Sequence, residues 1–242
     1  MKKNKVLDCP VYLINEEQAK VDIKHFIDTK VNGYFVAINA EKIYRYRQDK
    51  VLRNVIDNAL YPYPDGAGAV LSGKLFHNST SEKINMPTLA LEQANEYHWR
   101  VFIYGAKADI HSKAVTKIKQ EYPNIDIVGN LHGYQPEEEA LEQIRQSEPQ
   151  IVMLALGSPR QEYFAYKCTS SGAKGLFIGC GGALDIISGN INRAPEFFIN
   201  NGLEWFYRLV QEPWRWKRQL VLFQFAYKVI STKLANHLRL GK

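Results

Sequence analysis

From residue 99 onward, short apolar runs rich in β-branched and aromatic residues alternate with stretches that carry an apolar residue every three or four positions. The first pattern is typical of buried strands and the second of helices. We expect strands at 34–38, 101–104, 125–128, 151–156 and 175–178, and helices near 16–30, 41–59, 89–98, 109–122, 136–147 and up to about 171. This alternation predicts an α/β fold: a Rossmann-like parallel sheet with helices on both faces.

Glycines follow the carboxyl ends of the expected strands, at Gly105, Gly129, Gly157 and the cluster 179–182. Ligands of parallel sheets bind outside these ends, where glycine lets the backbone approach a phosphate closely. One such glycine is typical of any turn after a strand, but four in register favour a nucleotide-type ligand. The cluster is not a GxGxxG fingerprint because Leu184 holds the last glycine position, and no P-loop motif is present.

About the last thirty residues carry a separate helical pattern. Apolar residues recur there every three or four positions and form a stripe along one side of the expected helix. Four further apolar residues make this stripe wider in its middle. The stripe is Trp216, Leu220, Phe223, Tyr227, Ile230, Leu234 and Leu238, and the widening positions are Val221, Leu222, Phe225 and Val229. We therefore expect an α/β body over residues 1–195 and a helical amphipathic appendage over residues 196–242.

Charge also distinguishes this tail from the body. The chain has 31 Lys and Arg against 25 Asp and Glu, a net charge of +6, and seven basic residues but no acidic residue follow Pro213. Basic flanks beside a wide apolar face predict a helix that lies in an anionic membrane surface. The periodicity fits equally well a helix packed on the body or on a second copy of the chain. Nucleic acid is not expected, because phosphate binding favours a solvated basic face.

Other features of the composition exclude several classes. No run of about 18 uncharged apolar residues is present, so we expect no membrane-spanning helix. No apolar core follows the basic N-terminus, so we expect no signal peptide. Cys9, Cys168 and Cys180 are far apart, which indicates a reducing cytosol rather than a disulfide framework or a zinc site. No pattern of metal ligands appears, and we expect neither metal nor cofactor.

Three polar segments carry candidate catalytic groups. Asn39 lies in the run Val-Ala-Ile-Asn-Ala-Glu-Lys, where a role as helix N-cap would also explain it. Asp65 lies in Pro-Asp-Gly, a typical turn sequence. Residues 157–162, Gly-Ser-Pro-Arg-Gln-Glu, open an expected helix whose first backbone N–H groups attract anions. For the first two segments, structural and catalytic interpretations both stay open.

These segments, with GxGG-x-x-D at 179–185, Arg-Ala-Pro at 193–195 and GLEWFYRL-x-x-EP-x-R-x-x-R at 202–218, resemble the WecG/TagA/CpsF family of bacterial glycosyltransferases. Each motif is weak alone, but their order over residues 34–218 is specific. The resemblance implies inverting, metal-independent transfer of an N-acetylmannosamine-type sugar, or its uronic acid, from a UDP donor. The implied acceptor is polyprenyl-diphosphate-linked N-acetylglucosamine in surface polysaccharide synthesis, and the implied location is the cytoplasmic face of the plasma membrane, with self-association left open.

The resemblance also implies roles for individual residues. Asp65 matches the proposed catalytic base, Asn39 and Gln161 match catalytic groups of the same cleft, and Arg215 and Arg218 match arginines that close over the donor diphosphate. Tyr134 would stack on the base, and the glycine cluster with Asp185 would hold the nucleoside end. The implied substrate-binding positions are Glu41, Lys83, Tyr134, Gly157, Gly181, Gly182, Asp185, Arg193, Arg208, Arg215 and Arg218.

The chain departs from the family pattern in two places. Ala37 stands where many members carry threonine, so a hydroxyl is absent from the expected pocket. In the segment 82–89, Lys83 replaces an arginine and lacks its bidentate fork, and the usual Gly and Asp are missing. These departures leave one alternative open: a catalytically silent relative that binds a nucleotide-sugar or lipid and serves as a scaffold.

Overall fold

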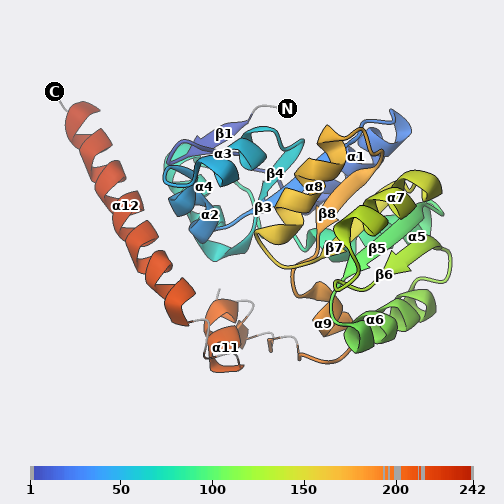
Figure 1. Cartoon of the computed structure of the whole chain (residues 1–242). Helices are drawn as coiled ribbons and strands as arrows, with labels where there is room; N and C mark the ends of the chain where they lie inside the picture. The colour runs from blue at the N-terminus through green and yellow to red at the C-terminus, as the bar shows by residue number, and fades with distance from the viewer. Residues whose placement is uncertain are drawn as a thin grey trace.

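A parallel sheet of six strands forms the centre of the molecule, in the order β4-β3-β8-β7-β5-β6 (Figure 1). The computed structural model describes residues 3–192, 194, 195, 197, 198, 203–211, 213 and 216–240; for 204, 208, 217–219 and 236–240 it describes the backbone alone. The sheet strands are β3 (Gly33–Ile38), β4 (Tyr61–Pro64), β5 (Arg100–Gly105), β6 (Asp126–Leu131), β7 (Ile151–Ala155) and β8 (Leu176–Gly179). An antiparallel pair, β1 (Asn4–Val6) and β2 (Cys9–Val11), lies beside them.

Helices cover both faces of this sheet. The helices of the body are α1 (Glu16–Asp28), α2 (Ala40–Tyr46), α3 (Lys50–Asp57), α4 (Gly66–His77), α5 (Met86–Glu96), α6 (Ala108–Glu121), α7 (Glu137–Ser147), α8 (Arg160–Ser170) and α9 (Ala183–Ile187). The C-terminal helices are α11 (Glu204–Gln211) and α12 (Trp216–Leu240).

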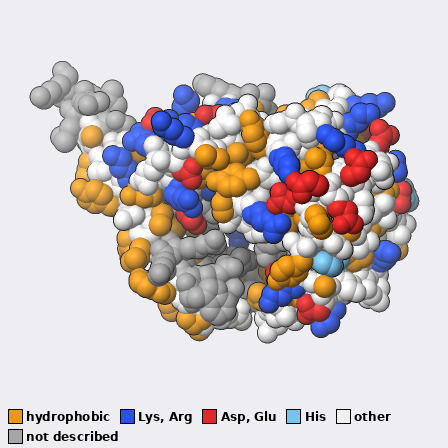
Figure 2. Space-filling model, in the orientation of Figure 1, with side chains coloured by type: hydrophobic (Ala, Val, Ile, Leu, Met, Phe, Trp, Pro, Cys, Tyr) orange, Lys and Arg blue, Asp and Glu red, His pale blue; other side chains and the backbone are white. Residues whose placement is uncertain are grey.

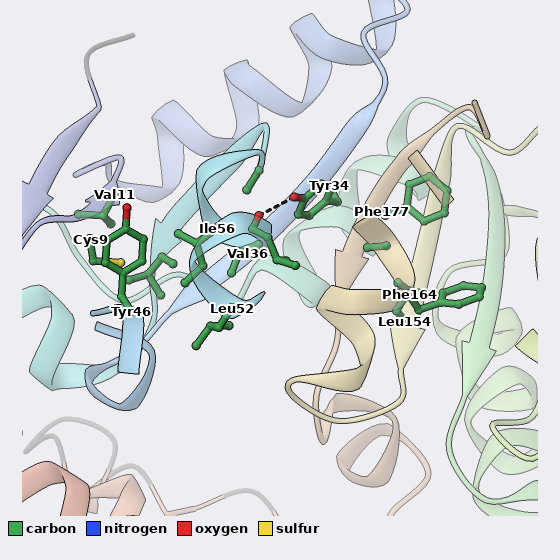
Figure 3. Packing of buried hydrophobic residues seen from close by; sticks show 14 of the residues in the cluster. Cys9, Val11, Tyr34, Val36, Tyr46, Leu52, Ile56, Leu154, Phe164 and Phe177 are labelled. Atoms are coloured by element: carbon green, nitrogen blue, oxygen red, sulfur yellow. Dashed lines mark hydrogen bonds between the residues drawn. The ribbon is translucent and has the colours of Figure 1, made fainter. Parts of the chain in front are cut away.

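Two apolar cores lie on opposite faces of the sheet, because successive side chains of a strand point to opposite sides. In β5, Phe102 and Tyr104 pack in the core with α2, α3, α7 and α8, whereas Val101 and Ile103 pack in the core with α1, α5 and α6. Figure 3 shows the first core, where the Tyr34 hydroxyl donates a hydrogen bond to the carbonyl of Val55 in α3. The parallel α/β fold with helices on both faces is confirmed.

The region between β3 and β4 differs from the expected single helix over 41–59, and that prediction is wrong. Asp49 separates two helices there, and its side chain accepts a hydrogen bond from Leu52 N at 2.9 Å. An aspartate N-cap of this kind starts a new helix and ends the preceding one.

The strand β4 was not expected from its sequence, Tyr-Pro-Tyr-Pro. Proline has no N–H to donate to a neighbouring strand, so it is tolerated chiefly at a sheet edge. The strand lies at the edge of the sheet, and the carbonyl of Pro62 accepts a hydrogen bond from Tyr12 N at 2.7 Å. The edge position explains how two prolines fit into a strand.

The C-terminal helix α12 has two apolar faces, one covered and one exposed. Phe225 and Val229 are buried in the first core, where α12 packs against α2 and α4. Lys233 Nζ also donates a hydrogen bond to the carbonyl of Leu75 in α4 at 2.7 Å. Three of the four widening positions, Leu222, Phe225 and Val229, therefore face the body.

Six large apolar residues of α12 form an exposed stripe: Trp216, Leu220, Phe223, Tyr227, Ile230 and Leu234. The side chain of Leu238, the last residue of the predicted stripe, lies outside the described part. Figure 2 shows apolar side chains along the edge of the molecule that α12 forms, at the left of the view. Across the described residues, no helix is long and apolar enough to cross a membrane. The helix expected from the periodicity is confirmed, and the body covers one of its two apolar faces.

Candidate active site

The connections of the sheet diverge at the carboxyl ends of β5 and β7. From β5 the chain proceeds to β6 on one side, and from β7 it proceeds to β8 on the other. In parallel sheets such a divergence opens a crevice that binds ligands. A cavity of about 710 Å³ lies at this point, and we call it the switch cavity. Its lining is Ala106, Lys107, Ile110, Gly133, Tyr134, Ala155, Leu156, Arg160, Asp185, Asn190, Ile191, Asn192 and Gln211.

Two of the predicted substrate-binding side chains line the switch cavity. Tyr134 follows β6 and is 73 % exposed, so its ring is available to a ligand. Asp185 lies in the first turn of α9, where Oδ1 accepts a hydrogen bond from Asn190 Nδ2 at 3.4 Å. Gly157 directly follows Leu156 of the lining. The roles of these residues stay predictions.

Two basic residues of the switch cavity, Lys107 and Arg160, were missing from the predicted site. Lys107 immediately precedes α6 and Arg160 opens α8, so both side chains join the positive end of a helix dipole at the cavity. Arg160 is held in place because Nε donates to Glu137 Oε1 at 3.0 Å. The sequence carried a signal for both, since each comes shortly after a glycine at a strand end.

At the same carboxyl edge of the sheet as the switch cavity, Asn39 and Asp65 follow the neighbouring strands β3 and β4. Ile38 and Pro64 are register partners, so the residue that follows each of them leaves the sheet at the same level. Asp65 N also donates to the Ile38 carbonyl at 2.9 Å. The two side chains were predicted to act together, and the parallel pairing of their strands brings their positions together.

Asn39 caps a helix with its side chain, whereas Asp65 does not. Asn39 is the N-cap of α2, where Oδ1 accepts a hydrogen bond from Lys42 N at 2.9 Å. That bond leaves its Nδ2 group as the part that could donate to a ligand. Asp65 precedes α4, but its side chain makes no capping hydrogen bond, so helix capping does not account for this carboxylate.

A buried phenol, that of Tyr63, lies near the Asp65 carboxylate at this end of the sheet. Burial raises the pKa of Tyr63 well above its ordinary value, and the nearby Asp65 carboxylate raises it further, with smaller contributions from Cys180 and Glu162. Tyr63 is 3 % exposed and lies two residues before Asp65. The phenol therefore stays protonated beside the carboxylate at neutral pH.

Gln161 is buried between α8 and the glycine turn after β8. Its Oε1 accepts a hydrogen bond from Gly181 N at 3.2 Å, and its Nε2 donates to Glu162 Oε1 at 3.4 Å. A Cβ at Gly179 would lie only 2.3 Å from Gln161 Nε2, so glycine there makes room for the amide. Gly182 follows in the same turn and caps α9.

Lys42 and Glu162 form a buried ion pair beneath these groups. Lys42 Nζ lies 2.8 Å from Glu162 Oε1, and the two side chains are 7 % and 2 % exposed. Lys42 Nζ also donates to the Ala37 carbonyl at 2.9 Å. The pair thus joins α2, which Asn39 caps, to α8, which carries Gln161. We call the three predicted catalytic residues the Asn39–Asp65–Gln161 group. Neither Lys42 nor Glu162 was among the predicted site residues.

The other predicted side chains are not shown to join the site. Glu41 lies 3.5 Å from Arg45 on the surface of α2. Lys83 is exposed in the segment between α4 and α5, next to Glu82, whose Oε1 accepts a hydrogen bond from Glu16 N at 2.8 Å. Arg193 and Arg215 lie outside the described residues. Arg208 and Arg218 belong to α11 and α12, but their side chains lie outside the described part. Within that part, no three His, Cys, Asp or Glu residues are grouped to hold a metal ion.

Comparison with known proteins identifies the family. Residues 4–239 match the glycosyl transferase WecG/TagA/CpsF family. Two relatives are named N-acetylglucosaminyldiphosphoundecaprenol N-acetyl-beta-D-mannosaminyltransferase. That of Bacillus subtilis (strain 168) is 38 % identical over 211 residues, which cover 86 % of this chain and 82 % of the relative. That of Bacillus spizizenii (strain ATCC 23059 / NRRL B-14472 / W23) is 33 % identical over 215 residues, covering 87 % and 84 %. The chain belongs to the WecG/TagA/CpsF family of glycosyltransferases.

Proposed function

We propose that this protein transfers an N-acetylmannosamine-type sugar, or its uronic acid, from a UDP donor to polyprenyl-diphosphate-linked N-acetylglucosamine. The observation that carries the proposal is that the switch cavity and the Asn39–Asp65–Gln161 group lie at the same carboxyl edge of the sheet, where Arg160 of the cavity directly precedes Gln161. The names of the two Bacillus relatives support the acceptor and the sugar.

The switch cavity suits a nucleoside diphosphate in size and charge. Its volume of about 710 Å³ lies within the usual range of small-ligand sites. Lys107, Arg160 and the N-termini of α6 and α8 would neutralise the diphosphate, and Tyr134 would stack on the base. The glycine turn and Asp185 would hold the nucleoside end. Because these groups supply positive charge, we propose that transfer requires no metal.

Asp65 would act as the general base of an inverting transfer. Its carboxylate takes the proton of the acceptor hydroxyl while that oxygen attacks the anomeric carbon from the face opposite UDP. The new glycosidic bond forms as the bond to the diphosphate breaks, and UDP leaves with the electron pair. Asn39 Nδ2 and Gln161 would orient the reacting sugars.

The exposed stripe of α12 would bring the enzyme to its lipid-linked acceptor. The stripe offers six apolar side chains on a helix that also carries basic residues. Anionic lipid adds about 1 kcal/mol per basic side chain near the surface. We propose that the helix lies in the cytoplasmic face of the plasma membrane. Arg215 and Arg218 would then close over the donor diphosphate, and Arg208 would be a further substrate-binding residue.

The test is release of UDP from a panel of UDP-sugars, with a synthetic lipid-diphosphate-N-acetylglucosamine acceptor and EDTA present. Acceptor-dependent release from one donor would identify the sugar and show that no metal is needed. The scaffold alternative is favoured by the atypical segment around Lys83. UDP binding without release from any donor would favour that alternative and contradict the proposed transfer.

A further inference from the structure

The buried pair of Lys42 and Glu162 links the connections that carry Asn39 and Gln161, and through Gln161 it reaches the glycine turn after β8. Lys42 lies in the first turn of α2, directly after β3, and donates to the Ala37 carbonyl of that strand. Glu162 lies in the first turn of α8, after β7, and accepts from both Lys42 and Gln161. Gln161 in turn accepts from Gly181 N, after β8.

The amide of Gln161 has a defined orientation only because of these two neighbours. Gly181 N–H is a donor and requires the oxygen of the amide, whereas the Glu162 carboxylate is an acceptor and requires its nitrogen. If Glu162 were replaced by glutamine, its side-chain amide could present either its oxygen, an acceptor, or its NH₂ group, a donor, to the nitrogen of Gln161. The Gly181 N–H and the Glu162 carboxylate therefore favour the same orientation of the Gln161 amide, and an amide at position 162 would remove one of these two determinants.

Stability does not account for this ion pair. A buried pair loses its hydration, and apolar residues of similar volume often stabilise a protein as well or better. The pair also leaves Glu162 Oε2 buried and without a hydrogen-bond partner among the described residues. Such an arrangement is costly for the fold, while it fixes the position of groups at the site.

We propose that Glu162, paired with Lys42, is a positioning residue of the transfer site: it orients the Gln161 amide and locks α2, with Asn39 before it, to α8. The expected effect on the rate of transfer rests on the proposed function. The expected effect on the orientation of the Gln161 amide does not depend on the reaction. Loss of the pair would slow transfer once both substrates are bound. It would leave binding of the nucleotide in the switch cavity nearly unchanged.

The test compares E162Q, the double variant K42M/E162M and the control D22N. Asp22 is a carboxylate of similar burial (5 % exposed), bonded to Tyr61 and Gln18 in the opposite core. We expect E162Q to lower kcat at least tenfold with the Kd for UDP within about twofold. The double variant should regain thermal stability without regaining kcat. D22N should lose thermal stability yet keep kcat within about twofold.

A second readout does not depend on transfer. In protein labelled with 15N at glutamine, the side-chain amide signal of Gln161, assigned from a Q161L variant, should shift in E162Q and in the double variant but not in D22N. Wild-type kcat in E162Q, recovery of both stability and kcat in the double variant, or an unshifted Gln161 signal would each overturn the proposal. If the wild type itself shows no transfer, the proposed function fails, while the Gln161 signal still decides the positioning role.

Discussion

The ring of Phe225 lies close to Gly68, where a side chain would crowd its neighbours. A Cβ at Gly68 would stand 3.5 Å from Phe225 Cε1 and 3.1 Å from the Cβ of Ala40. Gly68 belongs to the first turn of α4, directly after Asp65, and Ala40 begins α2, directly after Asn39. The C-terminal helix is therefore seated on the two helices that follow the proposed catalytic residues.

Replacing Phe225 with alanine should release α12 from the body. Phe→Ala changes in a core cost about 3–5 kcal/mol, and Phe225 is 5 % exposed. Because Phe225 and Val229 are the two buried apolar anchors of α12 among the described residues, we expect faster trypsin cleavage at Lys228 and Lys233 than in the wild type. Phe223→Ala is the matched control, since Phe223 is 71 % exposed. Equal cleavage rates for the two variants would contradict the packing of α12.

Removing the Arg160 side chain should weaken UDP binding about tenfold or more, because a charge-assisted hydrogen bond contributes about 1.5–3 kcal/mol. Titration calorimetry with UDP would measure the change. Lys167→Ala is a suitable control, because Lys167 also pairs with acidic residues of α7 but does not line the switch cavity. If the two variants bound UDP equally well, the diphosphate would lie elsewhere.

Asp65→Asn should lower kcat by about 10²–10⁴-fold, the usual contribution of a general base, and leave UDP binding intact. The fold should tolerate the change, because the Asp65 side chain makes no capping hydrogen bond. Steady-state UDP release and the thermal midpoint, measured together, check both statements. Unchanged turnover would remove Asp65 from the mechanism, and an unfolded variant would show a structural role.

The double substitution Phe223→Asp/Tyr227→Asp should abolish binding to anionic vesicles. Each large apolar side chain contributes about 1.5–3 kcal/mol when it leaves water, so two losses lower partitioning more than a hundredfold. Vesicle sedimentation would measure the bound fraction. Val21→Asp provides the comparison, since Val21 is similarly exposed (62 %) but lies on α1 in the other layer. Binding by both variants alike would indicate that a second copy of the chain or another partner covers the stripe.

The layered sheet could be predicted because its central strands are apolar on both sides, as in Ile151–Ala155. The edge strand Tyr61–Pro64 could not, because its two prolines are typical of a turn and only its place at the sheet edge makes them acceptable. Likewise α4 begins Gly-Ala-Gly, a sequence of low helix propensity that packing overrides, since Gly68 provides the seat for Phe225.

The candidate catalytic residues could be named only from the family resemblance, because Asp65 in Pro-Asp-Gly also has an ordinary explanation as a turn residue. The register of β3 and β4 places the position of Asp65 beside that of Asn39, and their catalytic roles stay predictions. Lys42 and Glu162 were missed because two charged residues 120 positions apart, each on a helix, look like ordinary surface residues in sequence. Only the folded chain brings their charges together in the interior.

The protein should lose stability above about pH 8.5. Burial raises the pKa of each of the three thiols, Cys9, Cys168 and Cys180, to about 12, whereas an unfolded thiol titrates near 8.5. Below pH 8.5 both states keep these protons, so stability is unaffected. Above it only the unfolded chain releases them, which favours unfolding by up to about 1.4 kcal/mol per thiol at pH 9.5. Urea unfolding at pH 7.5 and 9.5 would measure the loss, and the triple variant C9A/C168A/C180A should show a much smaller one. An equally steep loss in that variant would show that the thiols are not its source.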